Sequence, residues 1–318
     1  MTNKTVLITG GAGFIGSALA DRLLGKGYNV AVVDNFATGR RDNLVQRPNL
    51  EILEGSITDQ ELMTNFFSKV NPDVVVHAAA SYKDPEAWVE DSATNVVGTS
   101  IIVNEAKNAE VERFIYFQTA LCYGLHPEEQ PIPIDHELRP RESSYAISKT
   151  AGENYLALSG LNWVSFRLAN GYGPRNITGP LPTFFQRLSN GSPVFVMDTR
   201  RDFIFIEDLI DVVERAVDGE GEPGPYHVSS GSDVSIEELL EATLKSMGIE
   251  LDDPVEVRPR GEDDAFTILL DPSRTLEQFP GWEANTPLQD GVDRAVGYYR
   301  EFGIEETFTH LHMPDDDS

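Results

Sequence analysis

The chain has 318 residues, of which 40% are hydrophobic and 24% charged, a composition typical of a folded globular protein and not of a disordered or fibrous one. Its 52 acidic residues outnumber its 25 basic residues, and the formal charge of −27 argues against binding to nucleic acid or to an anionic membrane surface. No apolar run approaches the ~20 residues of a membrane-spanning helix, and no signal-peptide pattern precedes the first strand, so we expect a cytoplasmic protein.

Two further features of the composition concern the source organism and metal binding. The basic residues are eighteen arginines and seven lysines, which together with the acidic excess suggests a salt-adapted source, although an ordinarily acidic mesophilic protein has the same composition. Cys122 is the single cysteine and can form no internal disulfide. No Cys/His spacing of the zinc type is present, so we expect no metal.

Strand and helix patterns alternate through the first half of the chain. Residues 4–9 are expected to form a strand, 13–25 a helix and 29–34 a second strand, which together make a βαβ unit. Apolar runs predict further strands at 50–53, 73–77, 114–118 and 163–167, with helix-length segments between them. This order predicts an α/β fold with a Rossmann-type doubly wound parallel sheet.

Two of the intervening segments have apolar residues at helical spacing over their whole length. They are residues 93–110 and residues 145–158. Each is long enough to cover the sheet or to pair with a second subunit, and the pattern alone leaves both open.

The regular alternation of strand and helix patterns ends after Asn170, where glycines and prolines interrupt any regular sheet. We expect a smaller C-terminal α/β substrate lobe to begin there. A strand is expected at 203–206, a helix at 207–217, a strand at 226–229 and a helix from Ser235. The predicted division is therefore a dinucleotide-binding domain of residues 1–169 with a return segment near 203–229, and a substrate lobe of residues 170–202 and 230–318.

The segment VLITGGAGFIGS places Gly10, Gly13 and Gly16 between the first strand and its helix. In a dinucleotide fingerprint such glycines allow a tight turn, a close approach of the pyrophosphate and close packing of the helix on the strand. Asp34 follows eighteen residues after Gly16, at the end of the second strand. A carboxylate there accepts the ribose hydroxyls of NAD and repels the 2′-phosphate of NADP. The sequence favours NAD, although Arg40 and Arg41 nearby leave NADP open.

A second group of residues is suited to moving a proton. Thr119 follows the strand FIYFQ, and Tyr145 and Lys149 are spaced i, i+4, which places phenol and ammonium on one face of a helix. The ammonium, and the positive charge of an oxidised nicotinamide, favour the phenolate, so Tyr145 can take a proton from a hydroxyl. Thr119 is expected to hydrogen-bond the same oxygen, and Lys149 to hold the nicotinamide ribose.

Several other residues are interpreted as structural. His77 at a strand end is expected to be a satisfied buried histidine. Cys122 is expected to be a packing residue. Core or lobe-interface positions are expected for Trp88, Trp163 and Trp282.

The sequence resembles the extended short-chain dehydrogenase/reductases, specifically their nucleotide-sugar epimerase/dehydratase branch. The resemblance covers nearly the whole chain, through TGGAGFIGS, VVDNFATGRRDNL, HAAAS, NVVGT, QTALCYG, YAISK, RLANGYGPRN, RRDFIFIEDL and LLDPSR. It implies NAD as cofactor, a nucleoside-diphosphate sugar as substrate, and a homodimer built through a four-helix bundle that uses the two long helices. The motifs QTALCYG, GPLPTFFQRL and TILLDPSR look closest to UDP-sugar 4-epimerases of polysaccharide gene clusters.

The resemblance also implies roles for individual residues. Gly13, Phe14, Ile15 and Gly16 would contact the pyrophosphate, Asp34 and Asn35 the adenosine ribose, Ser56 and Ile57 the adenine, and Ala79 and Lys83 the middle of the cofactor. The sugar nucleotide would be held by Thr119, Asn170, Arg201 and one of Arg258 or Arg260, because forked guanidinium donors match phosphate oxygens.

Departures from the family pattern narrow the reaction. In the 4,6-dehydratases an Asp-Glu pair follows the hydroxyl residue, whereas this chain has Ala120 and Leu121, and the related decarboxylases also place a glutamate at the position of Leu121. Ser56 replaces the aspartate that commonly meets the adenine, and an extra residue precedes Lys83. We therefore predict a C4-epimerase that works through a transient 4-keto intermediate. The alternatives are another sugar-nucleotide oxidoreductase or dehydratase of the family, and a non-catalytic dinucleotide-sensing protein.

Overall fold

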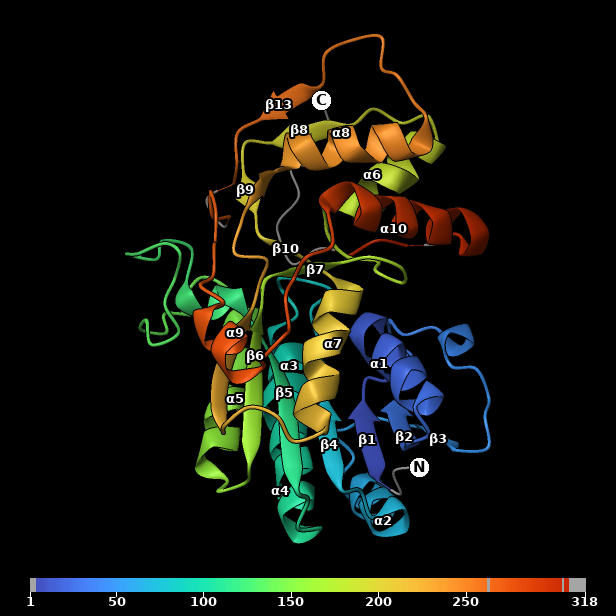
Figure 1. Ribbon diagram of the computed structural model, residues 1–318, viewed down its shortest axis with the longest axis vertical. Helices are drawn as coiled ribbons and strands as arrows, with labels where there is room; N and C mark the ends of the chain where they lie inside the picture. Colours follow the sequence, from blue (N-terminus) through green and yellow to red (C-terminus); the bar gives the residue numbers. More distant parts are fainter. Residues whose placement is uncertain (1–3, 262–263, 305, 309–318) are drawn as a thin grey trace.

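A seven-stranded parallel sheet forms the centre of the computed structural model (Figure 1), which describes residues 4–261, 264–304 and 306–308. The order of the strands across the sheet is β11-β6-β5-β4-β1-β2-β3, and every neighbouring pair is parallel. The strands are β1 (Thr5–Thr9), β2 (Asn29–Asp34), β3 (Leu50–Glu54), β4 (Val74–His77), β5 (Arg113–Thr119), β6 (Trp163–Leu168) and β11 (Gly224–Val228). The predicted doubly wound parallel sheet is confirmed, and each predicted strand of the first half is present with ends shifted by one residue or less.

Helices cover both faces of this sheet because its strands are apolar on both sides. On one face Val6 and Ile8 belong to a core with α1 (Phe14–Gly25) and α7 (Ile206–Val217). On the other face Leu7 and Val75 pack in a core with α2 (Gln60–Val70), α4 (Thr99–Asn108) and α5 (Ser144–Leu158). The alternation of Val6, Leu7 and Ile8 follows from the two-residue period of a strand.

Helix α1 packs directly on α7, which lies almost two hundred residues further along the chain. Glu214 of α7 is buried and accepts a hydrogen bond from Arg22 at 3.0 Å and another from Lys26. The C-terminal end of α1, away from the glycine turn, therefore bonds to a segment that is distant in the sequence.

The long helix expected over residues 93–110 is part of a helical region that begins earlier and is divided into segments. These segments are α3 (Trp88–Asp91), the π-helical turn η2 (Ser92–Gly98) and α4. Asn95 in η2 bonds to both backbone groups of Ser81 and to the hydroxyl of Ser148 on α5. A Cβ at Gly98 would lie 2.7 Å from the Ile57 side chain, so this turn packs closely on the loop that follows β3. Such wide turns occur where side chains insert into a helix.

Helices α6 (Pro180–Ser189), α8 (Ile236–Met247) and α10 (Leu288–Phe302) gather at one end of the molecule (Figure 1). The prolines that interrupt the sheet pattern begin α6, where a missing N–H costs nothing. The predicted helix start at Ser235 is confirmed, since Ser235 is the N-cap of α8 and forms a capping box with Glu238.

Short strands connect this end of the molecule to the sheet. They pair as β7 (Asn170–Tyr172) with β10 (Phe203–Phe205), β8 (Phe195–Met197) with β13 (Glu256–Arg258), and β9 (Arg200–Arg201) with β12 (Val234–Ser235). Short helices complete the described elements: η1 (Arg41–Asn43), η3 (Ala120–Tyr123) and α9 (Ser273–Gln278).

Within the described residues, no helix has the length and apolar character needed to cross a bilayer. The same part of the chain holds no group of three or more His, Cys, Asp or Glu side chains placed to ligate a metal.

Candidate active site

A cavity of about 630 Å³ lies at the carboxyl edge of the parallel sheet, between the sheet and the α6, α8, α10 end of the molecule. Residues at the ends of β1, β2, β4 and β5 line one side of it, and residues of α6, β8 and β9 line the other. Ligands of doubly wound sheets bind at this edge, where the strand order reverses.

The glycine turn between β1 and α1 forms the floor of the cavity. Gly10 has a φ of +66°, and a Cβ on it would lie 2.7 Å from the backbone of Ala79. A Cβ on Gly16 would lie 2.3 Å from the carbonyl oxygen of Gly10. Gly13 is the N-cap of α1, and no side chain of the described residues caps it. Phe14 and Ile15 line the cavity beside it, so the free N–H groups of this helix end are available to an anion.

Asp34 is held at the rim of the cavity by the backbone of two loops. One carboxylate oxygen accepts from the N–H of Ala12 at 2.8 Å, and the other from the N–H of Phe36 at 2.7 Å. Burial raises the pKa of Asp34, and the two backbone bonds oppose that change. The remaining lone pairs can accept the two hydroxyls of a ribose. The neighbouring Asn35 is exposed and lines the same cavity.

The two arginines near Asp34 are each paired with an acid. Arg40 lines the cavity and bonds to Asp42, and Arg41 bonds to Glu54. Their charges are thus partly neutralised beside a carboxylate that repels a 2′-phosphate. This part of the site fits NAD better than NADP.

Ser56, Ile57, Ala79 and Lys83 also line the cavity, as the resemblance implies. The Ser56 hydroxyl lies 2.8 Å from that of Thr58 and accepts from the Thr58 N–H at 3.2 Å. The Lys83 ammonium donates to the carbonyl oxygen of Ala37. The glycine turn, Asp34 and these four residues together form a continuous wall that suits an extended dinucleotide.

Thr119, Tyr145 and Lys149 line the same cavity. Thr119 ends β5, and its Oγ1 accepts from the N–H of Leu121 at 3.2 Å, which leaves the hydroxyl proton for a ligand. Tyr145 lies in the first turn of α5, which begins after the N-cap Ser143. Burial raises the pKa of the Tyr145 phenol and lowers the pKa of Lys149 to about 7. The three side chains that the sequence analysis grouped are therefore brought to one cavity.

His77 is buried and satisfied, which confirms its structural interpretation. Its two ring nitrogens bond to the hydroxyls of Thr9 and Thr99, at 2.6 and 2.9 Å, and burial keeps its pKa well below the usual range. Cys122 is fully buried, and burial raises the pKa of its thiol. The prediction for Trp88 is wrong, because its side chain lies on the surface and is 62% exposed.

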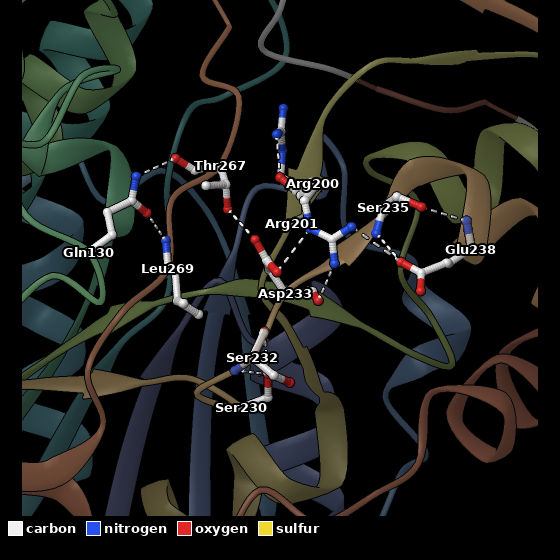
Figure 2. Close-up of polar contacts among 10 residues, drawn as sticks. All are labelled: Gln130, Arg200, Arg201, Ser230, Ser232, Asp233, Ser235, Glu238, Thr267 and Leu269. Atoms are coloured by element: carbon white, nitrogen blue, oxygen red, sulfur yellow. Dashed lines mark hydrogen bonds and ion pairs between the residues drawn. The ribbon is translucent and has the colours of Figure 1, made fainter.

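Of the predicted sugar-nucleotide residues, Asn170 and Arg201 line the cavity. Arg201 pairs with Asp264 and donates to the carbonyl oxygens of Arg200 and Ala265. Figure 2 shows how Arg200 is in turn held by Asp233, which also accepts from Thr267 at 2.8 Å. The β9 strand that carries Arg201 is thus anchored on both sides.

Arg258 and Arg260 are not among the residues that line the cavity. Arg258 is on β13, where its guanidinium lies 3.7 Å from the centroid of the Phe195 ring and pairs with Glu256. Arg260 is exposed. Their role in binding the nucleotide stays a prediction.

Two further cations, Arg175 and Arg187, line the cavity wall and were not among the predicted site residues. Arg175 has a φ of +71° and bonds to Asp21 at 2.7 Å, and Arg187 donates to the carbonyl oxygen of Pro193 at 2.7 Å. Both residues lie within family motifs given above, RLANGYGPRN and GPLPTFFQRL, and membership of these motifs was the signal that could have identified them.

A dinucleotide site that shares its cavity with a threonine, a tyrosine and a lysine defines a dinucleotide-dependent enzyme acting at a hydroxyl-bearing or carbonyl carbon. The chain belongs to the NAD dependent epimerase/dehydratase family, whose model matches residues 6–229. NAD is therefore its cofactor.

Similar solved structures and a similar curated protein extend the comparison beyond residue 229, over most of the chain. WbmH of Bordetella bronchiseptica, solved with NAD+, is 53% identical with a TM-score of 0.92, over 95% of this chain and 100% of that one. WbmG of the same organism, solved with NAD and UDP, is 42% identical with a TM-score of 0.90, over 98% and 100%. A UDP-glucose 4-epimerase of Mycolicibacterium smegmatis is 33% identical over 92% of this chain and 98% of its own length.

Proposed function

We propose that the protein is an NAD-dependent C4-epimerase of a nucleoside-diphosphate sugar, and that the nucleotide is UDP. The observation that carries the proposal is that Thr119, Tyr145 and Lys149 line one cavity with the glycine turn and Asp34. The similarity to a UDP-glucose 4-epimerase and to a protein solved with UDP supports the choice of nucleotide.

NAD, when bound, supplies an acceptor and donor of hydride. Gly10, Gly13 and Gly16 with the N-terminus of α1 would hold its pyrophosphate, and Asp34 its adenosine ribose.

Tyr145 removes the proton from the sugar 4-hydroxyl and later returns it, while Thr119 donates a hydrogen bond to the same oxygen. Lys149 follows Tyr145 by one helical turn on α5, and its ammonium favours the phenolate because a nearby positive charge stabilises the deprotonated form. Inversion further requires that the sugar be held loosely and the diphosphate tightly. We assign the tight part to Arg201, Asn170 and one of Arg258 or Arg260.

The side chains after Thr119 support epimerisation over elimination. Ala120 and Leu121 carry neither an acid nor a base, and both line the cavity where the dehydratases place their Asp-Glu pair. Another sugar-nucleotide oxidoreductase or dehydratase of the same family is the alternative function. A non-catalytic dinucleotide sensor would have no need of the three proton-handling side chains together.

A panel of UDP- and dTDP-sugars, with products separated by anion exchange and identified by proton NMR, tests the proposal. We expect conversion of a UDP-sugar to its 4-epimer without accumulation of NADH. Net formation of NADH, or a product that has lost water or carbon dioxide, would identify one of the alternatives.

Tyr145→Phe removes the phenol hydroxyl and is expected to lower kcat by about 10²- to 10⁴-fold while NAD stays bound. A variant with undiminished activity contradicts the assignment of Tyr145. The amount of NAD released on denaturation, compared with the wild type, checks that the site is intact.

We also propose a homodimer formed through a four-helix bundle. Large apolar side chains are exposed along α3, η2 and α5, namely Trp88, Val89, Val97, Ile147, Tyr155 and Leu158. Exposed apolar surface of this kind on two adjacent helices is typical of a protein interface. It also accounts for the surface position of Trp88.

The division into a dinucleotide domain and a substrate lobe is likewise a proposal. It is supported by the membership of β11 in the seven-stranded sheet, although β11 follows the helices α6 and α7 in the chain. A cytoplasmic location is supported by the chemistry of the proposed ligands, since charged nucleotides do not cross a bilayer unaided.

A further inference from the structure

Glu153 is a buried carboxylate that the proposed mechanism does not use. It lies on α5 four residues after Lys149 and eight after Tyr145, so the three side chains follow one face of the helix. Its residue is only 4% exposed. A carboxylate buried to this extent needs partners, and the partners show what it does.

Both carboxylate oxygens of Glu153 accept a hydrogen bond from a buried donor. Arg167 of β6 donates to Oε1 at 2.9 Å, and Gln118 of β5 donates to Oε2 at 2.9 Å. Gln118 and Arg167 stand opposite one another in the parallel pairing of β5 with β6. Glu153 therefore joins α5 to two neighbouring strands at one point.

The Gln118 side chain connects Glu153 to the catalytic residue Thr119. Its amide nitrogen donates to Glu153, and its amide oxygen accepts from the backbone N–H of Thr119 at 2.8 Å. An amide whose two ends are both bonded is fixed in orientation. The backbone at Thr119 is therefore held through Gln118 by Glu153.

Glu153 also balances charge around Lys149. The Lys149 side chain is buried, with its ammonium 4.1 Å from the centroid of the Tyr116 ring, and burial lowers its pKa while the charge of Glu153 raises it. Besides Arg167, which bonds to Glu153, the ionisable groups around these two residues are His77 on β4, Tyr116 on β5, Tyr145 on α5, and Cys122 and Tyr123 after β5. Glu153 is the acid that counters the two buried cations, Lys149 and Arg167.

We propose that Glu153 is a positioning residue for the reaction: its carboxylate fixes Gln118, which holds the backbone of Thr119, and its negative charge stabilises the Lys149 ammonium one helical turn away on the same face of α5. The inference rests on the proposed function for the reaction it serves. It adds to the catalytic group a residue that contacts neither substrate nor cofactor.

The test compares Glu153→Gln with the wild type in the full-length, NAD-loaded enzyme, using the UDP-sugar that the wild type converts. We expect kcat to fall about tenfold, with KM changed less than twofold, because Thr119 loses its support and a smaller fraction of Lys149 is protonated. The alkaline limb of the kcat profile is expected to move to lower pH, since the ammonium loses its proton more readily without the carboxylate.

Glu214→Gln is the matched control. Glu214 is buried to the same degree and bonds two cations, Arg22 and Lys26, where Glu153 bonds Arg167 and the Gln118 amide, but Glu214 lies on α7 away from the cavity. We expect it to lose thermal stability as Glu153→Gln does, with kcat per folded enzyme and the pH profile unchanged. If the two variants behave alike in kcat and in pH profile, Glu153 is only structural and the proposal is overturned.

Further variants separate the two parts of the proposal. Gln118→Met breaks the link to Thr119 and is expected to lower kcat without moving the alkaline limb, and it serves even if Glu153→Gln does not fold. Glu153→Asp keeps the charge and is expected to keep the alkaline limb of the wild type while kcat falls. A wild-type kcat in Gln118→Met would contradict the role of the link to Thr119. A shifted alkaline limb in Glu153→Asp would contradict the charge effect on Lys149.

Amide hydrogen exchange at Thr119 supplies a readout that needs no substrate. We expect faster exchange in Glu153→Gln and Gln118→Met than in the wild type and in Glu214→Gln. If the wild type converts no nucleotide sugar, the proposed function fails while this measurement still decides whether Glu153 holds Thr119. Unchanged protection in folded Glu153→Gln overturns the positioning role.

Discussion

Tyr116 and Lys149 contact one another in two ways. The Lys149 ammonium lies 4.1 Å from the centroid of the Tyr116 ring, and the Tyr116 hydroxyl donates to the carbonyl oxygen of Lys149 at 2.9 Å. Both residues are buried, and burial raises the pKa of Tyr116 well above its usual value, so the phenol stays neutral. A neutral ring face stabilises the cation only in part, which is consistent with a Lys149 pKa of about 7.

This burial predicts a specific dependence of stability on pH. The Lys149 pKa falls from 10.5 to about 7 on folding, so between these values the unfolded chain binds more protons and the contribution of Lys149 to stability becomes more favourable as pH rises. Lys149→Met removes this contribution. We expect the variant to gain stability over the wild type below pH 7 and to lose that advantage toward pH 10.5, as measured by urea unfolding at a series of pH values.

The glycine turn predicts how NAD is retained. A Cβ at Gly16 would lie 2.3 Å from the carbonyl oxygen of Gly10, so Gly16→Ala must displace the turn that faces the pyrophosphate. We expect the purified variant to lose its bound NAD and its activity. Gly25→Ala at the other end of α1 is the control, because its Cβ would meet nothing within 4 Å and alanine favours the helix. Equal NAD content in the two variants would contradict the assigned role.

Asp202 predicts a link between stability and the end of β9. Its buried carboxylate accepts from the Ser229 hydroxyl and from the N–H and hydroxyl of Ser230, and its carbonyl oxygen accepts from the N–H of Asn170. Asp202→Ala removes the carboxylate that accepts from Ser229 and Ser230 but keeps the backbone bond to Asn170, and we expect a loss of about 3 kcal/mol in the free energy of unfolding. Chemical denaturation measures the loss, and a change below about 1 kcal/mol would contradict it.

Asp202 also predicts a separate effect of pH. Burial raises its pKa from 3.8 to about 6, so the folded state binds the proton more tightly, and the contribution of Asp202 to stability becomes less favourable as pH rises from 3.8 to 6. That slope is expected to disappear in Asp202→Ala.

The exposed apolar side chains of α5 predict the oligomeric state. Leu158 is 82% exposed, and Leu158→Glu places a charge where the proposed bundle would bury it. We expect a shift from dimer to monomer in sedimentation velocity experiments. Leu276→Glu on α9 makes the same change at an exposed leucine outside these helices and is expected to stay dimeric. A monomeric wild type would refute the bundle.

The first half of the fold could be predicted because its signals are local. Buried parallel strands show as apolar runs, and the turn that binds a dinucleotide requires glycines at set positions, so both β1 to β6 and Asp34 can be identified from the sequence. The cavity-lining set Thr119, Tyr145 and Lys149 was likewise predictable from motif and spacing.

The remaining features depend on contacts between distant segments. The two-residue strand β9 has no periodicity, and it exists only because β12 pairs with it from more than thirty residues away. The π-helical turn at Asn95 follows from bonds to Ser81 and Ser148, which no helical pattern reveals. Trp88 was predicted to be a core or lobe-interface residue because tryptophan is mostly buried on average, and nothing local marks it as exposed.

The packing of α7 on α1 has a consequence for the newly made protein. Arg22 and Glu214 are 192 residues apart, so α1 leaves the ribosome long before α7, which packs against it, has been synthesised. Until then its apolar side is open to solvent, and the emerging polypeptide presents a surface that chaperones bind. Truncated products that stop before α7 are therefore expected to aggregate, even though they contain the whole nucleotide fingerprint.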